Sequence, residues 1–178
     1  MNVEQATYAD IARLPETLGN AQFFVDRFDR QKDGKGQLFI AWEDAKPVGV
    51  VYLWLEPAEE FYIRKYLKDV PLLTHLEVLP EYRKRGIGTE LIAALETYLV
   101  ELGHSKVALA VRDDNRLAAD LYKRLDYVDW GHGKQICFAD ASHPDGCPTA
   151  EPEVCYVMVK QLHSMRPSSD STFSSLAS

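Results

Sequence analysis

The residues with the most informative spacing lie in one segment, residues 76–89, which reads LEVLPEYRKRGIGT. A strand of buried type stops at Pro80, a basic turn with two glycines follows, and an apolar pattern of helical period begins at Ile87. Gly86 and Gly88 let a ligand approach the backbone closely, and unpaired amides at a helix start, together with the helix dipole, attract anions. The segment therefore predicts a site for a pyrophosphate-like group. A plain helix start with a solvated basic cluster is the alternative.

This turn differs from the common nucleotide-binding motifs. No Lys-Ser or Lys-Thr pair follows the second glycine, as the P-loop requires, and the GxGxxG pattern of dinucleotide-binding proteins is absent. We therefore do not expect this turn to be a P-loop or a dinucleotide-binding site.

The composition is that of an ordinary globular chain. Its 178 residues are 46% hydrophobic and 26% charged, enough apolar material for one domain with a sizeable core. The net charge of −7 argues against a general nucleic-acid coat and favours a cationic partner. We therefore expect no nucleic-acid partner. We also expect no membrane association, because no secretory signal and no run of about 20 apolar residues is present. A cytoplasmic location follows as the expectation.

The cysteines and histidines of the last third of the chain do not predict a metal site. Cys137, Cys147 and Cys155 are odd in number, which favours a reduced, intracellular setting. With His132 and His143 they lack the close spacing of structural zinc ligands, so we expect no metal and regard the thiols as adventitious. Cys147 is expected to be the most exposed of the three.

Hydrophobic periodicity predicts the elements that position these residues. Strands are expected at 3–6, 37–43, 48–56, 72–79, 106–111, 127–131 and 154–162; helices are expected at 10–28, 87–102 and 115–126, with a short one in the loop 57–71. A four-residue turn, 44–47, should join the second and third strands as a hairpin. Strands 72–79 and 106–111, separated by a helix, should be a parallel pair with a right-handed crossover. Residues 133–153 read as an extended excursion or long hairpin loop.

A second match carries the interpretation beyond the turn. Arg83, Gly86 and Gly88 match the acetyl-CoA motif of the GNAT superfamily of N-acetyltransferases, and Asn115 and Tyr122 match its Asn followed seven residues later by a Tyr. The chain resembles that superfamily over about residues 1–162. Asp126 departs from the pattern, because a Gly is commoner before the aromatic residue.

The resemblance implies an α/β fold with a central mixed β-sheet, N-terminal antiparallel strands, a splayed parallel strand pair and helices on both faces. It implies one N-acetyltransferase domain, residues 1–163. The Ser-rich tail, residues 164–178, is expected to be disordered. Many relatives are dimers, so a homodimer is kept open.

The resemblance also implies that acetyl-CoA is the co-substrate and assigns residues to it. Leu76 and Val78 would bind the pantetheine arm through their backbone groups. The residues expected to bind the cofactor are Leu76, Val78, Arg83, Lys84, Arg85, Gly86, Ile87, Gly88, Thr89, Asn115 and Tyr122.

Two catalytic roles follow for an amine that attacks the thioester directly in a ternary complex. By family analogy Tyr122 lies beside the thioester sulfur, where a phenol can donate a proton to the departing thiolate; the alternative is a core tyrosine on an apolar helix stripe. The amine must also lose a proton. His75 and Glu77 are the nearest ionisable groups, and Glu77 is the candidate catalytic residue, although strand alternation puts both on the face opposite Thr74 and Leu76. Both residues have a structural explanation as the alternative.

The acceptor cleft is expected after the hairpin, where acidic and aromatic residues gather. The candidate substrate-binding residues are Tyr52, Trp54, Glu56, Glu59 and Phe61, with Tyr62 beside them. An aromatic, acidic cleft suits a small cationic amine, such as an aminoglycoside-like molecule or a polyamine. A solvated charge run is the alternative for the glutamates. A protein N-terminus or lysine remains open as the acceptor, as does a non-catalytic module that senses acetyl-CoA or binds another protein.

Overall fold

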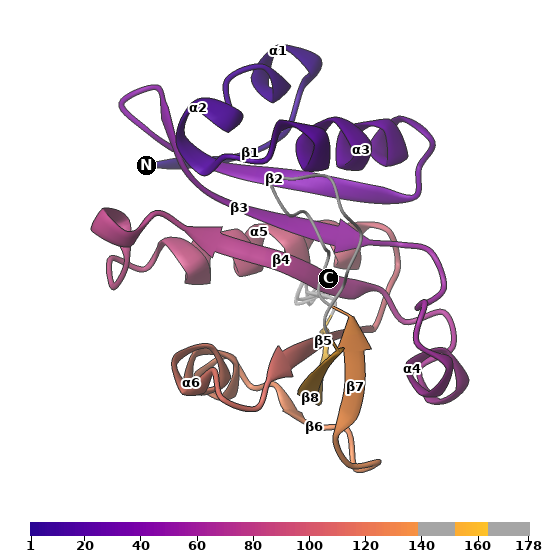
Figure 1. The fold of residues 1–178 in the computed structure, drawn as a ribbon. Coiled ribbons are helices and arrows are strands. Elements are labelled where there is room, and N and C mark those ends of the chain that lie inside the picture. Colours follow the sequence, from indigo (N-terminus) through magenta and orange to yellow (C-terminus); the bar gives the residue numbers. More distant parts are fainter. Residues whose placement is uncertain (139–151, 164–178) are drawn as a thin grey trace, which may run out of the picture.

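A mixed sheet of eight strands forms the centre of the computed structural model, which describes residues 1–138 and 152–163 (Figure 1). The strands follow the order β1-β2-β3-β4-β5-β8-β6, and β7 pairs with β8. They are β1 (Asn2–Gln5), β2 (Gly36–Glu43), β3 (Lys46–Trp54), β4 (Leu72–Val78), β5 (Lys106–Arg112), β6 (Val128–Asp129), β7 (Gln135–Phe138) and β8 (Pro152–Gln161). All strands that the sequence predicts are present, and the α/β mixed-sheet fold is confirmed.

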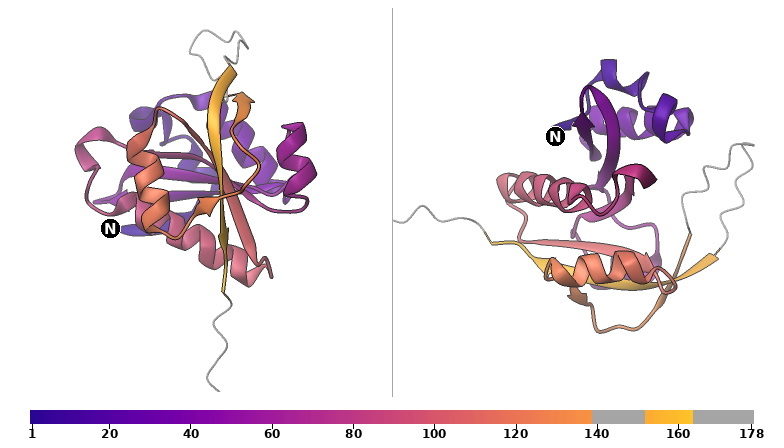
Figure 2. Two further views of the ribbon diagram at one scale, coloured as in Figure 1. Left: turned by 90° about the horizontal axis from the view of Figure 1, so that it is seen from below. Right: turned by 90° about the vertical axis from the view of Figure 1, so that its left-hand side faces the viewer.

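Helices cover both faces of the sheet (Figures 1 and 2). They are α1 (Tyr8–Ile11), α2 (Pro15–Leu18), α3 (Ala21–Lys32), α4 (Phe61–Tyr66), α5 (Ile87–Glu101) and α6 (Arg116–Arg124), with a 3-10 turn η1 (Pro80–Tyr82). In the described part of the chain, none of these helices has both the length and the apolar character that crossing a membrane requires.

The N-terminal helical region differs from the prediction of one helix over 10–28. It consists of the three helices α1, α2 and α3. Pro15 begins the short helix α2, and Gly19, with φ +67°, ends it. The N-cap of α1 is Thr7, and Asp10 is the third residue of a capping box with it. The Thr7 amide donates to Asp10 Oδ2 at 2.8 Å. Asp10 therefore stabilises the start of α1, a helix of four residues.

The hairpin of β2 and β3 is joined by a two-residue turn, and the prediction of a four-residue turn was wrong. Asp44 and Ala45 have φ of +48° and +60°, which matches the right-handed twist of the two strands. Lys46 and Pro47 already belong to β3. Proline has no N–H to donate to the neighbouring strand, and the bulge lies beside Pro47, where the regular pairing is interrupted.

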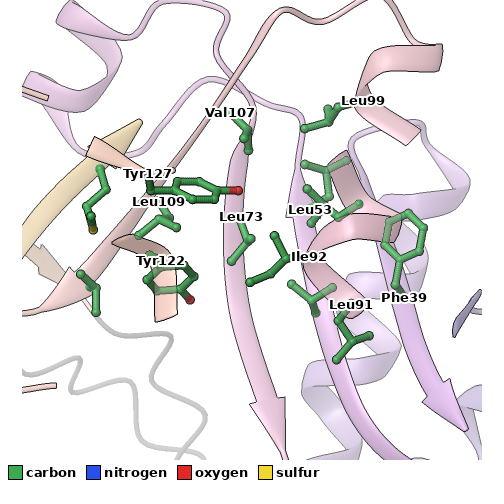
Figure 3. Packing of buried hydrophobic residues seen from close by; sticks show 14 of the residues in the cluster. Phe39, Leu53, Leu73, Leu91, Ile92, Leu99, Val107, Leu109, Tyr122 and Tyr127 are labelled. Carbon is green, nitrogen blue, oxygen red and sulfur yellow. The ribbon is translucent and has the colours of Figure 1, made fainter. Parts of the chain in front are cut away.

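The sheet separates two apolar clusters. On one face α5 and α6 cover the larger cluster, which includes Phe39, Leu73, Leu91, Leu109, Tyr122 and Tyr127 (Figure 3). On the other face α1, α2 and α3 pack on β2 and β3, with Phe23, Phe24, Leu38, Val50 and Tyr52 in the core. A third, small cluster joins the region of α4 to β7 and β8 and includes Ala58, Ile63, Cys137, Cys155 and Val157.

The strand β4 contains a bulge, so its side chains do not alternate as predicted. Val50 pairs with Glu77 and Tyr52 with Thr74, so β4 has one more residue than β3 in this interval, and His75 has φ +47°. Directly paired residues share a face, so Thr74 lies with Tyr52 on the α3 face. His75 packs on Phe23 of α3, which places it there too. The prediction that Thr74 and His75 lie on opposite faces was therefore wrong.

The helix after β5 agrees with the sequence except at its start. Asn115 is the N-cap of α6, but the apolar residue Leu117 in its first turn is 80% exposed. Leu117 stands in the first turn, before the helix reaches the sheet. Asp126 follows the helix at φ +65°, a conformation that glycine adopts freely, which explains why glycine is commoner there. The tail predicted to be disordered, residues 164–178, lies outside the described residues. Cys147 and His143 also lie outside them.

A polar network ties α5 to β8 inside this frame. Tyr127 Oη donates to Glu96 Oε1 at 2.9 Å, and Lys160 Nζ lies 2.7 Å from Glu96 Oε2. The Glu96 and Lys160 side chains are only 16% and 19% exposed. Burial, followed by the neighbouring Glu96 carboxylate, raises the pKa of Tyr127 far above its usual range.

We predict that Glu96→Ala lowers the free energy of unfolding by about 2–3 kcal/mol, because it leaves Tyr127 and Lys160 without their shared partner. Glu101→Ala, on an exposed position of the same helix, should change it by less than about 0.5 kcal/mol. Urea denaturation measures both. Equal effects of the two substitutions would contradict a stabilising role for this network.

Candidate active site

The centre of the sheet opens where β4 and β5 separate. These parallel strands pair only at Leu72 with Ala108 and at Leu73 with Leu109. Beyond this point β4 remains paired with β3, and β5 remains paired with β8. The predicted splayed parallel pair is therefore present.

The open edge of β4 presents backbone groups to this gap. The Leu79 N–H donates to the Val48 carbonyl of β3 at 3.0 Å. Because backbone groups alternate in direction along a strand, those of Val78 and Leu76 point away from β3, toward the gap. Interior strand edges left unpaired in this way can accept an added extended chain. The backbone role predicted for Leu76 and Val78 has the required direction.

The turn after β4 orients its amides toward one point. Lys84 and Gly86 have φ of +61° and +85°, and Gly86 is the N-cap of α5. The Glu90 N–H bonds to the Gly86 carbonyl at 3.1 Å, which makes it the first intrahelical bond. The amides of residues 87–89 precede that bond and have no intrahelical acceptor. They lie where the sequence predicts an anion site, at the positive end of the dipole of a 15-residue helix.

Gly88 lies where this turn meets the gap. A Cβ atom built on it would come within 3.5 Å of Leu121 in α6 and 3.9 Å of Leu76 in β4. Gly88 therefore stands between α6 and β4, beside the separated strands. A Cβ at Gly86 meets nothing within 4 Å, so the backbone there is open to an approaching group.

The three cations of the turn differ in their contacts. Arg83 Nε donates to the Val78 carbonyl at 2.9 Å and occupies one of the backbone acceptors at the strand end. Arg85 lies 2.5 Å from Glu43 and over the Tyr82 ring at 5.2 Å. Among the described residues Lys84 has no ion-pair partner and is exposed. Lys84 is thus the cation most available to a bound anion.

Tyr122 lies on α6, on the face of the sheet that α5 also covers (Figure 3). Its side chain is 6% exposed, its ring lies 5.7 Å from that of Tyr127, and its hydroxyl has no hydrogen-bond partner among the described residues. Burial raises the pKa of the Tyr122 phenol well above its usual range. The hydroxyl is therefore protonated at neutral pH and free to donate.

Asn115 fixes the start of the same helix. Its Oδ1 accepts from the Ala118 N–H at 3.1 Å, so this oxygen serves the helix cap. Its amide nitrogen is left for another partner. The seven-residue spacing to Tyr122 is two helical turns, so the cap sets the rotation at which Tyr122 meets the sheet.

A cavity of about 330 Å³ opens at the point of strand separation, on the face that carries α3 and α4. Its floor comes from β4 and β5, and its walls come from the end of β3, the α4 region, β7 and β8. Its lining includes Trp54, Glu59, Glu60, Leu73, Thr74, His75, Leu109, Ala110, Arg112, Cys137, Glu153 and Cys155. Leu73 and Leu109, the last paired residues of β4 and β5, also belong to the apolar cluster around Tyr122. The cavity and Tyr122 therefore lie on opposite faces of the same opening.

Two of the five predicted substrate-binding residues, Trp54 and Glu59, line this cavity. Tyr52 is buried against α3, and burial raises its pKa to about 12. Glu56 does not line the cavity, because it forms an ion pair with Arg30.

A second hollow of about 240 Å³ lies next to this cavity. Phe61 and Tyr62, both more than half exposed, line it with Gln135 and Ile136. Glu59 and Glu60 border both spaces. Phe61 thus lies next to the principal cavity rather than in it.

The sequence did not identify two charged residues of the cavity wall, Arg112 and Glu153. They line the cavity together with Glu60 and His75. Arg112 and Glu153 meet at 3.1 Å only because β8 returns beside β5, a pairing that no local pattern reveals. Arg112 also lies 2.7 Å from Asp114, whose pKa it lowers. The wall is therefore acidic, with one cation already paired.

The two described cysteines are poor nucleophiles. Cys137 and Cys155 are free and buried in the cavity wall. Burial raises the pKa of both thiols, that of Cys137 far above its usual range. A protonated thiol is a weak nucleophile, so neither cysteine is a candidate for covalent catalysis. The described residues contain no group of three His, Cys, Asp or Glu side chains that could hold a metal ion.

Comparison with known proteins agrees with this geometry. Residues 5–127 match the family model described as Acetyltransferase (GNAT) family. The chain is 43% identical over 53 residues to the acetyltransferase SG1711 of Sodalis glossinidius, a stretch that covers 30% of this chain and 37% of that protein. The match thus spans little more than a third of that relative.

Solved structures show the same fold at low identity. An N-acetyltransferase from Staphylococcus aureus Mu50 aligns with a TM-score of 0.68 and 10% identity, over 91% of this chain and 98% of that one. A ribosomal-protein-alanine N-acetyltransferase from Brucella melitensis aligns with a TM-score of 0.66 and 18% identity, over 91% and 100%. The agreement extends over nearly the whole length of both structures.

We predict that coenzyme A raises the Tm of the protein and that Gly86→Asp abolishes this shift. At about 100 times its Kd, a ligand that binds only the folded state adds about 2.7 kcal/mol, which is about 5–10 °C for a chain of this size. The new carboxylate would repel phosphate oxygens at the open backbone. Thermal denaturation with and without coenzyme A measures the shift.

Gly103→Asp is the matched control. Gly103 follows the other end of α5, also has φ +85°, and also has nothing within 4 Å of a built Cβ. The two variants therefore carry the same backbone strain. A full coenzyme A shift in Gly86→Asp, or its loss in Gly103→Asp as well, would contradict the assignment of the turn as the phosphate site.

Proposed function

Because the chain belongs to the GNAT family of acetyltransferases, we propose that it transfers an acetyl group from acetyl-CoA to the primary amine of a small cationic molecule. The observation that carries this proposal is the opening between β4 and β5, which connects an anion-binding turn and Tyr122 on one face with an acidic cavity on the other. Both substrates can meet there without a covalent enzyme intermediate.

The turn and the gap offer groups that suit acetyl-CoA. The amides of residues 87–89, with Lys84, would hold the pyrophosphate, and the backbone of Leu76 and Val78 would bind the pantetheine arm. The bound co-substrate supplies the acetyl thioester whose carbonyl carbon the amine attacks. The chain itself contributes binding, orientation and proton transfer.

Tyr122 would assist departure of the thiolate. Its raised pKa keeps the phenol protonated, so a donor is always present at neutral pH. A thiol has a pKa of about 8.5, so complete proton transfer from a phenol to a thiolate is uphill. The assistance therefore comes mainly from hydrogen bonding to the developing charge.

The acceptor class follows from the cavity wall. Glu59 has no ion-pair partner among the described residues, whereas Glu153 is paired with Arg112. The Trp54 ring provides an aromatic surface, and Arg30 lies over it at 4.6 Å. A cavity of about 330 Å³ with carboxylates at its entrance suits a compact amine that carries a second positive charge.

The experiment that tests this function is thiol release from acetyl-CoA with a panel of amines. The panel contains a polyamine, an aminoglycoside, a neutral monoamine and a peptide with a free N-terminal alanine. Turnover that is fastest with the first two supports the proposal. Preference for the peptide would make the chain a protein acetyltransferase, the activity named for its Brucella neighbour. Coenzyme A binding without turnover would favour a non-catalytic module.

We predict that Tyr122→Phe lowers kcat by about 10²-fold, at the lower end of the range for general acid assistance, with little change in the Kd of acetyl-CoA. The substitution keeps the ring and removes only the donor. Tyr127→Phe is the control, because it removes a hydroxyl from the neighbouring ring, and that hydroxyl already donates to Glu96. Tyr127→Phe should lower Tm and leave kcat unchanged. An unchanged kcat in Tyr122→Phe would make Tyr122 a core residue.

We predict that Glu59→Gln raises the KM for a polyamine about two- to five-fold and leaves kcat unchanged, as expected for loss of one exposed charge contact. The increase should shrink in high salt, because exposed charges are screened. Glu101→Gln, on α5 and outside the cavity lining, is the control. If KM is the same for wild type and Glu59→Gln, the carboxylate does not contact the acceptor.

A further inference from the structure

His75 occupies the bulge of β4 at the edge of the acceptor cavity. One extra residue of β4 is accommodated between the pairs Val50 with Glu77 and Tyr52 with Thr74. His75 has φ +47°, a conformation that is costly for residues other than glycine and that occurs often at functional sites. Without this bulge, regular alternation would direct His75 and Thr74 to opposite faces.

The aromatic core of α3 fixes the imidazole ring. The ring lies 4.0 Å from that of Phe23 at an interplanar angle of 34°, and 6.4 Å from that of Phe24 at 87°. Nε2 lies 3.3 Å from Glu77 Oε2. The imidazole is therefore restrained by two phenyl rings and one carboxylate, while its side chain remains 27% exposed and lines the cavity.

The other polar groups of the cavity are less suited to accept a proton. Thr74 does not ionise near neutral pH, and the raised pKa values of Cys137 and Cys155 keep them as thiols. Arg112 is always protonated and is paired with Glu153. Imidazole ionises closer to neutral pH than a carboxylate does, which suits a general base at neutral pH.

We propose that His75 accepts the proton of the acceptor amine, and that Glu77 is the positioning residue for its imidazole. This inference rests on the proposed function and replaces Glu77, the sequence-based candidate, as the proton acceptor. Glu77 does not line the cavity, whereas His75 does.

The proton and electron balance is as follows. The ammonium group gives one proton to His75, directly or through one water. The nitrogen lone pair forms the C–N bond to the thioester carbonyl carbon, and the C–S bond breaks with its electrons on sulfur. The Tyr122 hydroxyl donates a hydrogen bond to the developing thiolate, the thiolate takes a proton from solvent, and the nitrogen loses its second proton to solvent. The proton on His75 passes to solvent, so one proton is released for each acetyl group transferred.

The test uses His75→Asn, because Asn tolerates positive φ better than other residues and does not titrate. We expect kcat at pH 7 to fall by about 10²- to 10⁴-fold, with the Kd of coenzyme A unchanged. His104→Asn is the matched control, since His104 lies after α5 and outside the cavity lining. It should leave kcat within two-fold of wild type, roughly the scatter expected for a surface substitution.

The pH profile separates catalysis from a structural role. In wild type, kcat at saturating amine should fall on the acid side, and this acid limb should be absent in His75→Asn. The charged or titratable groups facing His75 are Glu77 on its own strand, Glu59 and Glu60 before α4, Arg112 on β5, Cys137 on β7, and Glu153 and Cys155 on β8. Glu77→Gln should lower kcat and leave the KM for the amine unchanged, because it removes the carboxylate that holds the imidazole, and Glu77→Asp should restore kcat.

A readout independent of turnover completes the test. In the presence of coenzyme A, titration with a polyamine should shift the NMR resonance of the His75 ring Cε1–H and leave that of His104 in place. If wild type releases thiol with an amine while His75→Asn keeps its kcat and its acid limb, the assignment of His75 is overturned and the proposed function stands. An unmoved His75 resonance would also overturn it. If wild type acetylates no amine, the proposed function itself fails.

Discussion

The loss of pairing between β4 and β5 after Leu73 and Leu109 is the constraint on which the site depends. Each strand keeps its outer partner, so the sheet remains continuous at both sides while its centre opens. Backbone groups left unpaired inside a protein carry a desolvation cost unless another group bonds to them. Arg83 supplies such a group to the Val78 carbonyl. The remaining backbone groups make the gap a place where an extended ligand gains hydrogen bonds that the sheet itself has given up.

The opening also explains how the fold keeps two substrates apart until they react. The turn and Tyr122 lie on the side of α5 and α6, and the cavity lies on the side of α3 and α4. Leu73 and Leu109 belong to the apolar cluster around Tyr122 and also line the cavity. The passage between the two faces of the sheet therefore lies beside these last paired residues. The β4 bulge acts at the same place, since it adds His75 to the cavity face while Val78 stays paired with Gly49 of β3. One irregular residue thus changes the chemistry of one face and preserves the binding edge on the other.

The sequence predicted the parts of this arrangement that depend on local spacing. The strand, the glycine turn and α5 were identified from neighbouring residues, because each is fixed within a short segment. The Asn115 to Tyr122 spacing was identified from the resemblance to the GNAT superfamily. The features that it missed depend on pairing or on backbone conformation. The bulge at His75 depends on the register against β3, and Arg112 meets Glu153 only through the return of β8. The ion pair of Glu56 was missed for the same reason, because its partner Arg30 lies on α3.

The charge distribution gives the two faces opposite preferences under the proposed function. The chain is acidic overall, yet its basic cluster of Arg83, Lys84 and Arg85 stands at the start of α5, where the helix dipole adds to it. Arg85 is neutralised by Glu43, which leaves Lys84 and the amides as the attraction for phosphate. On the cavity side Arg112 is paired with Glu153 and Asp114, and Glu59 has no ion-pair partner within residues 1–138 and 152–163. A polyanionic co-substrate is therefore repelled from the cavity and a cationic amine from the turn, so each reaches the opening from its own side.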